Sequence, residues 1–310
     1  MSVANIHSRY AIQLDTQSPS VPVMLGGVTS QNLANNNDIR GMKTDGGIYQ
    51  EFIALHGQAP AGSFGTVSIK RALDEIGLLG HKIANNGANF YAQKWVEGST
   101  PDTDPTHTRY NVREGVIVPR TLSVDHRGNA SLSYDVLVTY DGTNDPIVTT
   151  HNVALPTDDA PEDRWTLAQA TVGSLVIGQL TNLSVEFGVD ARTIGANSDV
   201  WDTFAQIRGV TPSISLSGTD IQTLGGAKIP NTGQAMTHAN TTFILRKRAG
   251  KSTFVDPGTA EHISFTADGM AVVETIFSDN GDEPASVSVN MPLRFDGVNV
   301  PIVFNTAASY

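Results

Sequence analysis

The chain of 310 residues contains no cysteine, so disulfides, thiolate catalysis and zinc sites built on cysteine sulfur are excluded. Charged residues make up only 16% of the chain and aromatic residues only 7%, whereas hydrophobic residues, at 39%, are frequent enough to bury a sizeable core. Glycine, serine, threonine, asparagine and valine are plentiful, and few stretches have helical periodicity. This combination predicts a mainly β protein with many short strands and turns.

Positive charge is also scarce, because the formal net charge is −11. Nucleic-acid affinity comes chiefly from Lys and Arg, so a surface that grips phosphates is disfavoured, although nucleic acid could still pass along the protein. No apolar run approaches membrane-spanning length, and residues 1–20 lack a basic segment followed by an apolar core and a cleavage site. We therefore expect the chain to be made and kept in the cytoplasm, without a membrane partner.

A repeat dominates what the sequence does contain. Residues 129–148, NASLSYDVLVTYDGTNDPIV, and residues 284–303, PASVSVNMPLRFDGVNVPIV, are identical at nine of twenty positions without a gap. About one identity would be expected by chance, and such self-similarity is typical of repeated structural units. The repeat extends upstream, because residues 48–60 match residues 200–212 with Phe, Gly and Pro in step.

Each copy of the repeat alternates with a period of two, which predicts a strand with one buried face. In the first copy one face carries Leu132, Tyr134, Val136, Val138 and Tyr140, and the other carries Ser131, Ser133, Asp135 and Thr139. Each strand then reaches Asp-Gly, a dipeptide suited to tight turns, and the chain restarts at Pro-Ile-Val. The pattern predicts a hairpin or a hairpin-like corner in each copy.

Further elements complete two tandem units. Ser68 can cap a short helix with Ile69, Leu73 and Ile76 on one face and Gly77 at its end, and residues 219–224 offer a shorter version. A first strand is expected at residues 21–28 and a long polar loop at residues 29–47. We predict an N-terminal arm at 1–20, a first unit at 21–155, an acidic linker at 156–165 and a second unit at 166–310.

The chain contains no sequence motif that supports catalysis. The Ala249–Thr253 stretch, AGKST, lacks the upstream glycine of a phosphate-binding loop. The Ser278–Pro284 turn lacks the spacing of a calcium loop, and the eight histidines are scattered. We therefore predict no enzyme activity and no catalytic, cofactor-binding or metal-binding residues.

Strands grouped around one helix per unit, a long early loop and the stretch VPRTLSVDHRGNASLSYDVLVTYDG resemble the major tail tube proteins of long-tailed (siphovirus-type) bacteriophages, in their duplicated form. The resemblance covers most of the chain, but it is one of pattern. It implies two tandem β-sandwich or barrel units, each with one short flanking α-helix. Inner strands of neighbouring units would join into a barrel around a lumen.

The same resemblance implies a function in the virion. Three duplicated chains would form a ring of six units, and rings would stack into a tube that contains the tape-measure protein and later conducts DNA in transit. Tail-tip and tail-terminator proteins would bind its ends, and an acidic lumen would repel phosphates. The alternatives are another β-rich virion protein, such as a capsid decoration or tail-tip component, and a β-sandwich that binds or hydrolyses carbohydrate.

The residues expected to take part in assembly fall into three groups. Residues 1–20 and 29–47 are expected to contact neighbouring rings, the polar face of residues 131–139 to face the lumen or a subunit seam, and the basic run at 246–248 to accept acidic loops of a neighbour. The candidates are Asn35, Asn36, Asn37, Asp38, Arg40, Lys43, Asp45, Ser131, Ser133, Asp135, Thr139, Arg246, Lys247 and Arg248.

Overall fold

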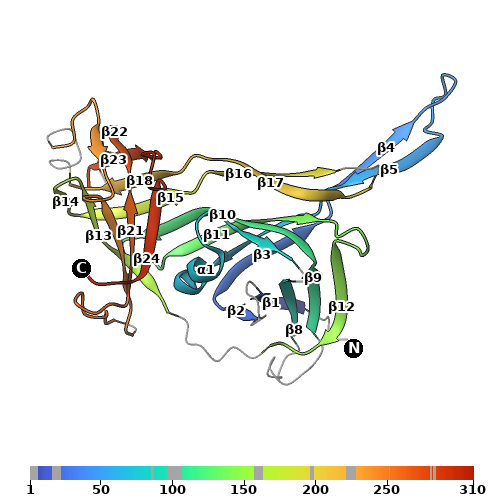
Figure 1. Cartoon of the computed structure of the whole chain (residues 1–310), viewed down its shortest axis with the longest axis horizontal. Helices are drawn as coiled ribbons and strands as arrows, with labels where there is room; N and C mark the ends of the chain where they lie inside the picture. Colours follow the sequence, from blue (N-terminus) through green and yellow to red (C-terminus); the bar gives the residue numbers. More distant parts are fainter. Residues whose placement is uncertain are drawn as a thin grey trace.

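The computed structural model describes residues 6–15, 22–84, 87–95, 107–156, 163–195, 199–220, 228–250, 252–279, 281 and 284–310. Within them the chain is mainly β, as predicted, with several antiparallel sheets and one helix. Figure 1 shows a broad body of packed sheets from which one hairpin projects.

The first half of the chain, residues 6–153, is built from antiparallel strands and one helix. In chain order these elements are β1 (Ile6–Leu14), β2 (Val23–Leu25), β3 (Val28–Ala34), β4 (Asn37–Met42), β5 (Phe52–Gln58), β6 (Ala61–Thr66), α1 (Ile69–Ile76), β7 (His81–Ile83), β8 (Ala88–Trp95), β9 (His107–Val112), β10 (Glu114–Asp125), β11 (Ser131–Thr139) and β12 (Ile147–Val153).

The second half, residues 165–308, repeats this series of strands. Its strands are β13 (Trp165–Val172), β14 (Leu175–Ile177), β15 (Leu180–Glu186), β16 (Val189–Gly195), β17 (Asp202–Val210), β18 (Ser213–Gly218), β19 (Gln234–Met236), β20 (Thr242–Lys247), β21 (His262–Ala267), β22 (Gly269–Ser278), β23 (Ser286–Pro292) and β24 (Ile302–Ala308). Adding twelve to the number of a strand in the first half gives its counterpart in the second.

The pairing of the strands follows the same repeat. The first half has a five-stranded sheet in the order β12-β9-β8-β1-β2, and the second half has its counterpart in the order β14-β13-β20-β21-β24. The hairpins β4-β5 and β16-β17 also correspond, including a register shift after the second pair from their base. The duplication inferred from the sequence is therefore a duplication of topology.

One sheet contains strands from both halves. Its ten strands run in the order β19-β22-β23-β18-β15-β10-β11-β6-β3, with β7 paired to β10 beside this path. Strands β10 and β15 join the halves, and we call their pairing the seam. The two repeated units are thus parts of one folded body.

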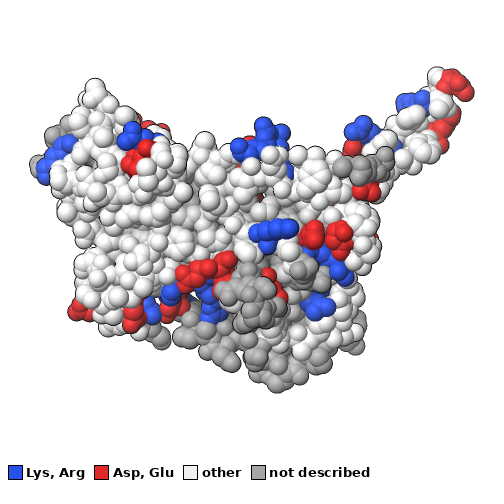
Figure 2. All heavy atoms as spheres, viewed as in Figure 1, with Lys and Arg blue, Asp and Glu red and all other residues white. Residues whose placement is uncertain are grey.

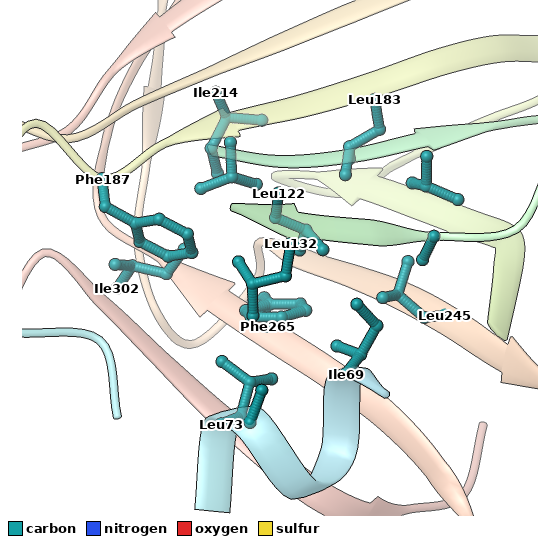
Figure 3. Packing of buried hydrophobic residues seen from close by; sticks show 14 of the residues in the cluster. Ile69, Leu73, Leu122, Leu132, Leu183, Phe187, Ile214, Leu245, Phe265 and Ile302 are labelled. Carbon is teal, nitrogen blue, oxygen red and sulfur yellow. The ribbon is translucent and has the colours of Figure 1, made fainter. Parts of the chain in front are cut away.

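The core lies between this sheet, the two five-stranded sheets and helix α1. Leu122 and Leu132 from the first half and Leu183, Ile214 and Phe265 from the second are fully buried in one continuous cluster (Figure 3). Leu132, Tyr134, Val136 and Val138 are buried along β11, which confirms the predicted face of that strand. Burial of this alternating face is the main stabilising contribution, at about 25 cal/mol per Å² of apolar surface.

Helix α1 forms where it was predicted. Ile69, Leu73 and Ile76 are buried, and the N–H of Gly77 at the C-terminal end donates to the Leu73 carbonyl. Ser68 occupies the N-cap position, but its side chain makes no capping hydrogen bond, so that part of the prediction is wrong. The second predicted helix falls largely on residues 221–227, outside the described residues.

The N-terminal prediction is wrong for residues 6–14. They were expected to form an arm rather than a packed element, yet β1 pairs with β2 and β8, and Ile12 and Leu14 are buried. Pairing on both sides of β1 satisfies backbone groups that an arm would leave to solvent. In the second half the expected linker ends early, because Trp165 begins β13 and is buried.

The long loop predicted at residues 29–47 is instead most of strand β3, strand β4 and part of the connection to β5. Its polar sequence hid these strands, because neither face of β4 is buried in the chain. The strand expected at residues 21–28 is only the three-residue β2 and the start of β3.

Strands β11 and β12 form a corner and do not pair with each other. Strand β11 belongs to the ten-stranded sheet, and β12 pairs with β9 in a five-stranded sheet. Of the two shapes predicted for this turn, the corner is confirmed and the hairpin is wrong.

The buried hydroxyl of Tyr134 gives a testable prediction about the core. Its ring stacks on Phe64 with centroids 5.0 Å apart, but its oxygen has no hydrogen-bond partner among the described residues. Burial raises the pKa of Tyr134 well above its ordinary value. An unpaired buried hydroxyl is destabilising, so Tyr134→Phe should raise the free energy of unfolding by about 1 kcal/mol, measured by urea denaturation.

Tyr134→Ala is the matched control for packing at this position. It should lower the free energy of unfolding by about 3 kcal/mol, because it removes a fully buried ring. If Tyr134→Phe also destabilised the protein by a comparable amount, the hydroxyl would have a stabilising hydrogen-bond partner, which would contradict this prediction.

Candidate assembly surfaces

The seam is the strand pairing that joins the two repeated units within the chain. Leu122 lies opposite Val185 and Ser123 opposite Ser184, and both apolar side chains are fully buried. Two backbone hydrogen bonds extend the pairing, from Phe187 N to the Arg120 carbonyl at 2.9 Å and from His126 N to the Thr181 carbonyl at 2.8 Å. The seam is therefore a paired and sealed junction.

The counterparts of the two seam strands lie at or near opposite ends of the same sheet. Strand β22 corresponds to β10 and pairs with β23 and with the short β19, whereas β3 corresponds to β15 and pairs with β6. The described residues give neither strand a partner equivalent to the one it has at the seam. Ile276 on β22 is 55% exposed, although its counterpart Leu122 is fully buried. The chain thus presents each half of a second seam, one at either end.

The solvent-facing side of the ten-stranded sheet is rich in small polar residues from both halves. Residues that lie opposite one another on adjacent strands share a face, so the pairing defines one row across five strands. The row consists of Ser131, Ser123, Ser184, Ser215 and Asn290. This row is uncharged, and the same face carries the acidic side chains of Asp125 and Glu186 beside it.

The four candidate residues of β11 differ in their exposure. Ser131, Ser133 and Asp135 are partly exposed on the polar face, but Thr139 is buried, so its placement on a solvent-facing surface is wrong. Asp135 pairs with Arg120 at 3.0 Å. Partial burial raises the pKa of Asp135, and the charge of Arg120 opposes this effect.

The candidates at residues 35–45 lie on the projecting hairpin or at its base. Asn35 and Asn36 join β3 to β4, and Asn36 has a positive φ of 46° that permits the tight junction. Asn37, Asp38 and Arg40 lie on β4, and Lys43 and Asp45 lie around the tip. Arg40 pairs with Asp38 at 2.8 Å, and Figure 2 shows acidic and basic side chains together on this projection.

The sequence-based assignment missed the apolar side chains of this hairpin. Large hydrophobic residues here are 43–82% exposed. Exposed patches of such side chains often mark contact surfaces. They are Ile39, Met42, Ile48, Tyr49, Phe52, Ile53 and Leu55. The repeat could have revealed them, since Tyr49 and Phe52 match Trp201 and Phe204 of the second half.

The basic run at the end of β20 is largely engaged within the chain. Lys247 pairs with Glu261 at 2.8 Å and with Asp163 at 3.2 Å. Burial opposes protonation of Lys247, but the hydrogen bonds to these two carboxylates raise its pKa. Arg246 and Arg248 lie over the ring of Phe254, 5.0 and 5.4 Å from its centroid. The structure thus gives these side chains partners within the chain.

The comparisons with known proteins do not assign the chain to a family. No protein-family model matches it, and no curated protein matches its sequence. In the described part of the chain no helix is long and apolar enough to cross a membrane, and no group of three or more His, Asp or Glu side chains is placed to bind a metal ion. The repeated surfaces themselves are therefore the basis for a functional proposal.

The Asp-Gly corners are fixed by hydrogen bonds to their aspartate side chains and give a pH-dependent prediction. At the second corner Asp296 accepts hydrogen bonds from the Asn299 side chain and from the N–H groups of Asn299 and Val298. These bonds lower the pKa of Asp296 from 3.8 to about 2. The stability that they contribute is present above about pH 4 and is lost as the pH falls towards 2.

Asp296→Asn should therefore lower the Tm at neutral pH, and the difference from the parent should shrink as the pH falls from about 4 to about 2. Circular dichroism melts across this range measure the effect. Asp45→Asn at the hairpin tip is the matched control for the loss of one exposed negative charge. A Tm difference for Asp296→Asn that stayed constant down to pH 2 would contradict the account.

Proposed function

We propose that this chain is the structural subunit of a bacteriophage tail tube, which assembles into stacked rings around a lumen that conducts DNA. The supporting observation is the seam together with its two open counterparts. Strand β10 pairs with β15 inside the chain, and β22 and β3 offer the same pair of edges to other copies. A surface that matches a different surface of an identical chain is a heterologous contact, which generates rings or filaments.

The internal seam predicts the register between copies. The register shift of β10 between Pro119 and Thr121 corresponds to the first shift of β22, between Val273 and Thr275, and the shifts of β15 and β3 also correspond. Thr275 is therefore the counterpart of Thr121, and β22 has a second shift, between Thr275 and Ser278, that β10 lacks. Thr275 of one copy would lie opposite Ala34 of the next, Ile276 opposite Leu33, and Ser278 opposite Asn32. This pairing would cover the exposed Ile276 and satisfy the backbone groups of both edges.

Closure of such contacts would place one face of the continuous sheet towards the lumen. The serine-rich face suits this position, because it lacks the dense Lys and Arg side chains that bind phosphates by releasing counterions. DNA could then pass without adhering. The face also carries the exposed Asp125 and Glu186 and the Arg120–Asp135 pair, so the proposed lumen combines hydroxyl groups with an excess of negative charge.

Three chains would supply six repeated units per ring, as the resemblance to duplicated tail tube proteins implies. Stacked rings would then enclose the tape-measure protein, contact tail-tip and tail-terminator proteins at the tube ends, and belong to the virion. No cofactor or catalytic step is required for this role.

The edge-pairing account predicts a separation of folding from assembly. Asn35 N corresponds to Phe187 N, which donates to the Arg120 carbonyl at the seam. Asn35→Pro removes this donor at an exposed position, so the chain should fold with a Tm close to the parent but fail to form rings. Light scattering and negative-stain electron microscopy of the purified protein measure the loss.

Asn35→Ala is the matched control, because it removes the side chain and keeps the N–H group. It should assemble like the parent. Assembly of Asn35→Pro into normal tubes would contradict pairing of β22 with β3, and a parent that stays monomeric at high concentration would contradict the tube itself.

A further inference from the structure

Inside the chain, the hairpin of the second half lies against the first half. Strands β16 and β17 contact β10 and β11, and Figure 1 shows them running across these strands towards the base of the β4-β5 hairpin. The anchor is Trp201, the residue before β17. Its ring lies on Tyr140 with centroids 4.8 Å apart, and its Nε1 donates to Gln58 Oε1 at 2.6 Å.

Backbone hydrogen bonds fix this anchor from two sides. Gln58 N donates to the Val200 carbonyl at 2.7 Å, and Tyr140 N donates to the Asp202 carbonyl at 2.8 Å. Trp201 and Tyr140 are both only partly exposed as a result. The contact therefore combines an aromatic pair with main-chain hydrogen bonds, a combination that defines both position and orientation.

The first half has a corresponding hairpin, which does not lie across a sheet of the described part of the chain as β16-β17 does. Its β4-β5 hairpin matches β16-β17 in register from Asn37 to Met42 but projects away from the body (Figure 1). Tyr49 is the counterpart of Trp201 and is 82% exposed, whereas Phe295 is the counterpart of Tyr140 and is 61% exposed. Both members of a second aromatic pair are thus present but separated in one chain.

An apolar pocket lies beside Phe295. A pocket of about 550 Å³ is lined there by apolar side chains, including Phe295, Val210, Pro212 and Leu79. Val210 is the counterpart of Gln58, which receives the anchor inside the chain. A Cβ placed on Gly57 would lie 3.7 Å from the Val200 carbonyl oxygen, whereas one on its counterpart Gly209 would meet nothing within 4 Å.

We propose that the β4-β5 hairpin of one copy docks on the second half of a neighbouring copy, with Tyr49 against Phe295 beside Val210. The hairpin would cover β22 and β23 of the neighbour as β16 and β17 cover β10 and β11. Its exposed apolar side chains and the apolar pocket would then bury each other.

This inference rests on the proposed function for the choice of neighbour. The copy that receives the hairpin is the one whose β22 pairs with β3 at the hairpin's base, so both contacts join the same two chains. The hairpin would thus link chains within one ring, in place of the contacts between rings expected from the sequence.

The test uses site-specific cross-linking, because the chain contains no cysteine of its own. Tyr49→Cys and Phe295→Cys chains are prepared separately, mixed under assembly conditions and treated with a short bismaleimide. The mixture should give a covalent dimer on a denaturing gel, and each variant alone should remain monomeric. The double variant Tyr140→Cys with Trp201→Cys is the positive control, since its link should form within one chain.

A second mixture separates this inference from the proposed function. Leu33→Cys and Ile276→Cys chains report the edge pairing alone. If they cross-linked and the Tyr49→Cys with Phe295→Cys mixture did not, the hairpin inference would be overturned while the ring would stand. A link only in the hairpin mixture would support docking and contradict the edge pairing, and failure of both would overturn the two proposals together.

Discussion

The backbone N–H and C=O groups along the edges of the ten-stranded sheet impose the constraint on which this structure depends. Each edge strand leaves such groups without a sheet partner, and a long exposed edge with apolar side chains is prone to pair with another chain. Edge N–H and C=O groups therefore need a pairing strand, and the duplication supplies one at the seam between β10 and β15. The same requirement arises again at β22 and β3, and the proposed partner for both is another copy of the chain.

The duplication was visible in the sequence because two parts of each unit depend strongly on their side chains. Buried alternation along β11 and β23 fixes which residues are apolar, and Asp141 and Asp296 fix their corners through hydrogen bonds to following N–H groups. Helix α1 was predictable for the same reason, since three buried side chains share one face. Where burial produces a clear periodic pattern, sequence alone was sufficient, but β1 was missed although Ile12 and Leu14 are buried.

The predictions failed where structure depends on distant partners. An Asp-Gly turn indicates that the chain reverses, but it does not say whether the next strand pairs with the last one or joins another sheet, as β12 does. Strands β3 and β4 resembled a loop because β4 has no buried face within one chain. Tyr49 was overlooked for the same reason, because it packs against nothing that would reveal a contact within one chain. Its proposed contact is inferred from that of its counterpart Trp201.

We propose that the seam inside the chain recurs between chains. A cryo-electron microscopy map of the assembled protein, at a resolution that traces the backbone, tests it most directly. We predict a continuous sheet in which β22 of each chain lies antiparallel to β3 of the next, with Thr275 opposite Ala34. A map in which copies meet through other strands, or in which both edges face solvent, would contradict the claim.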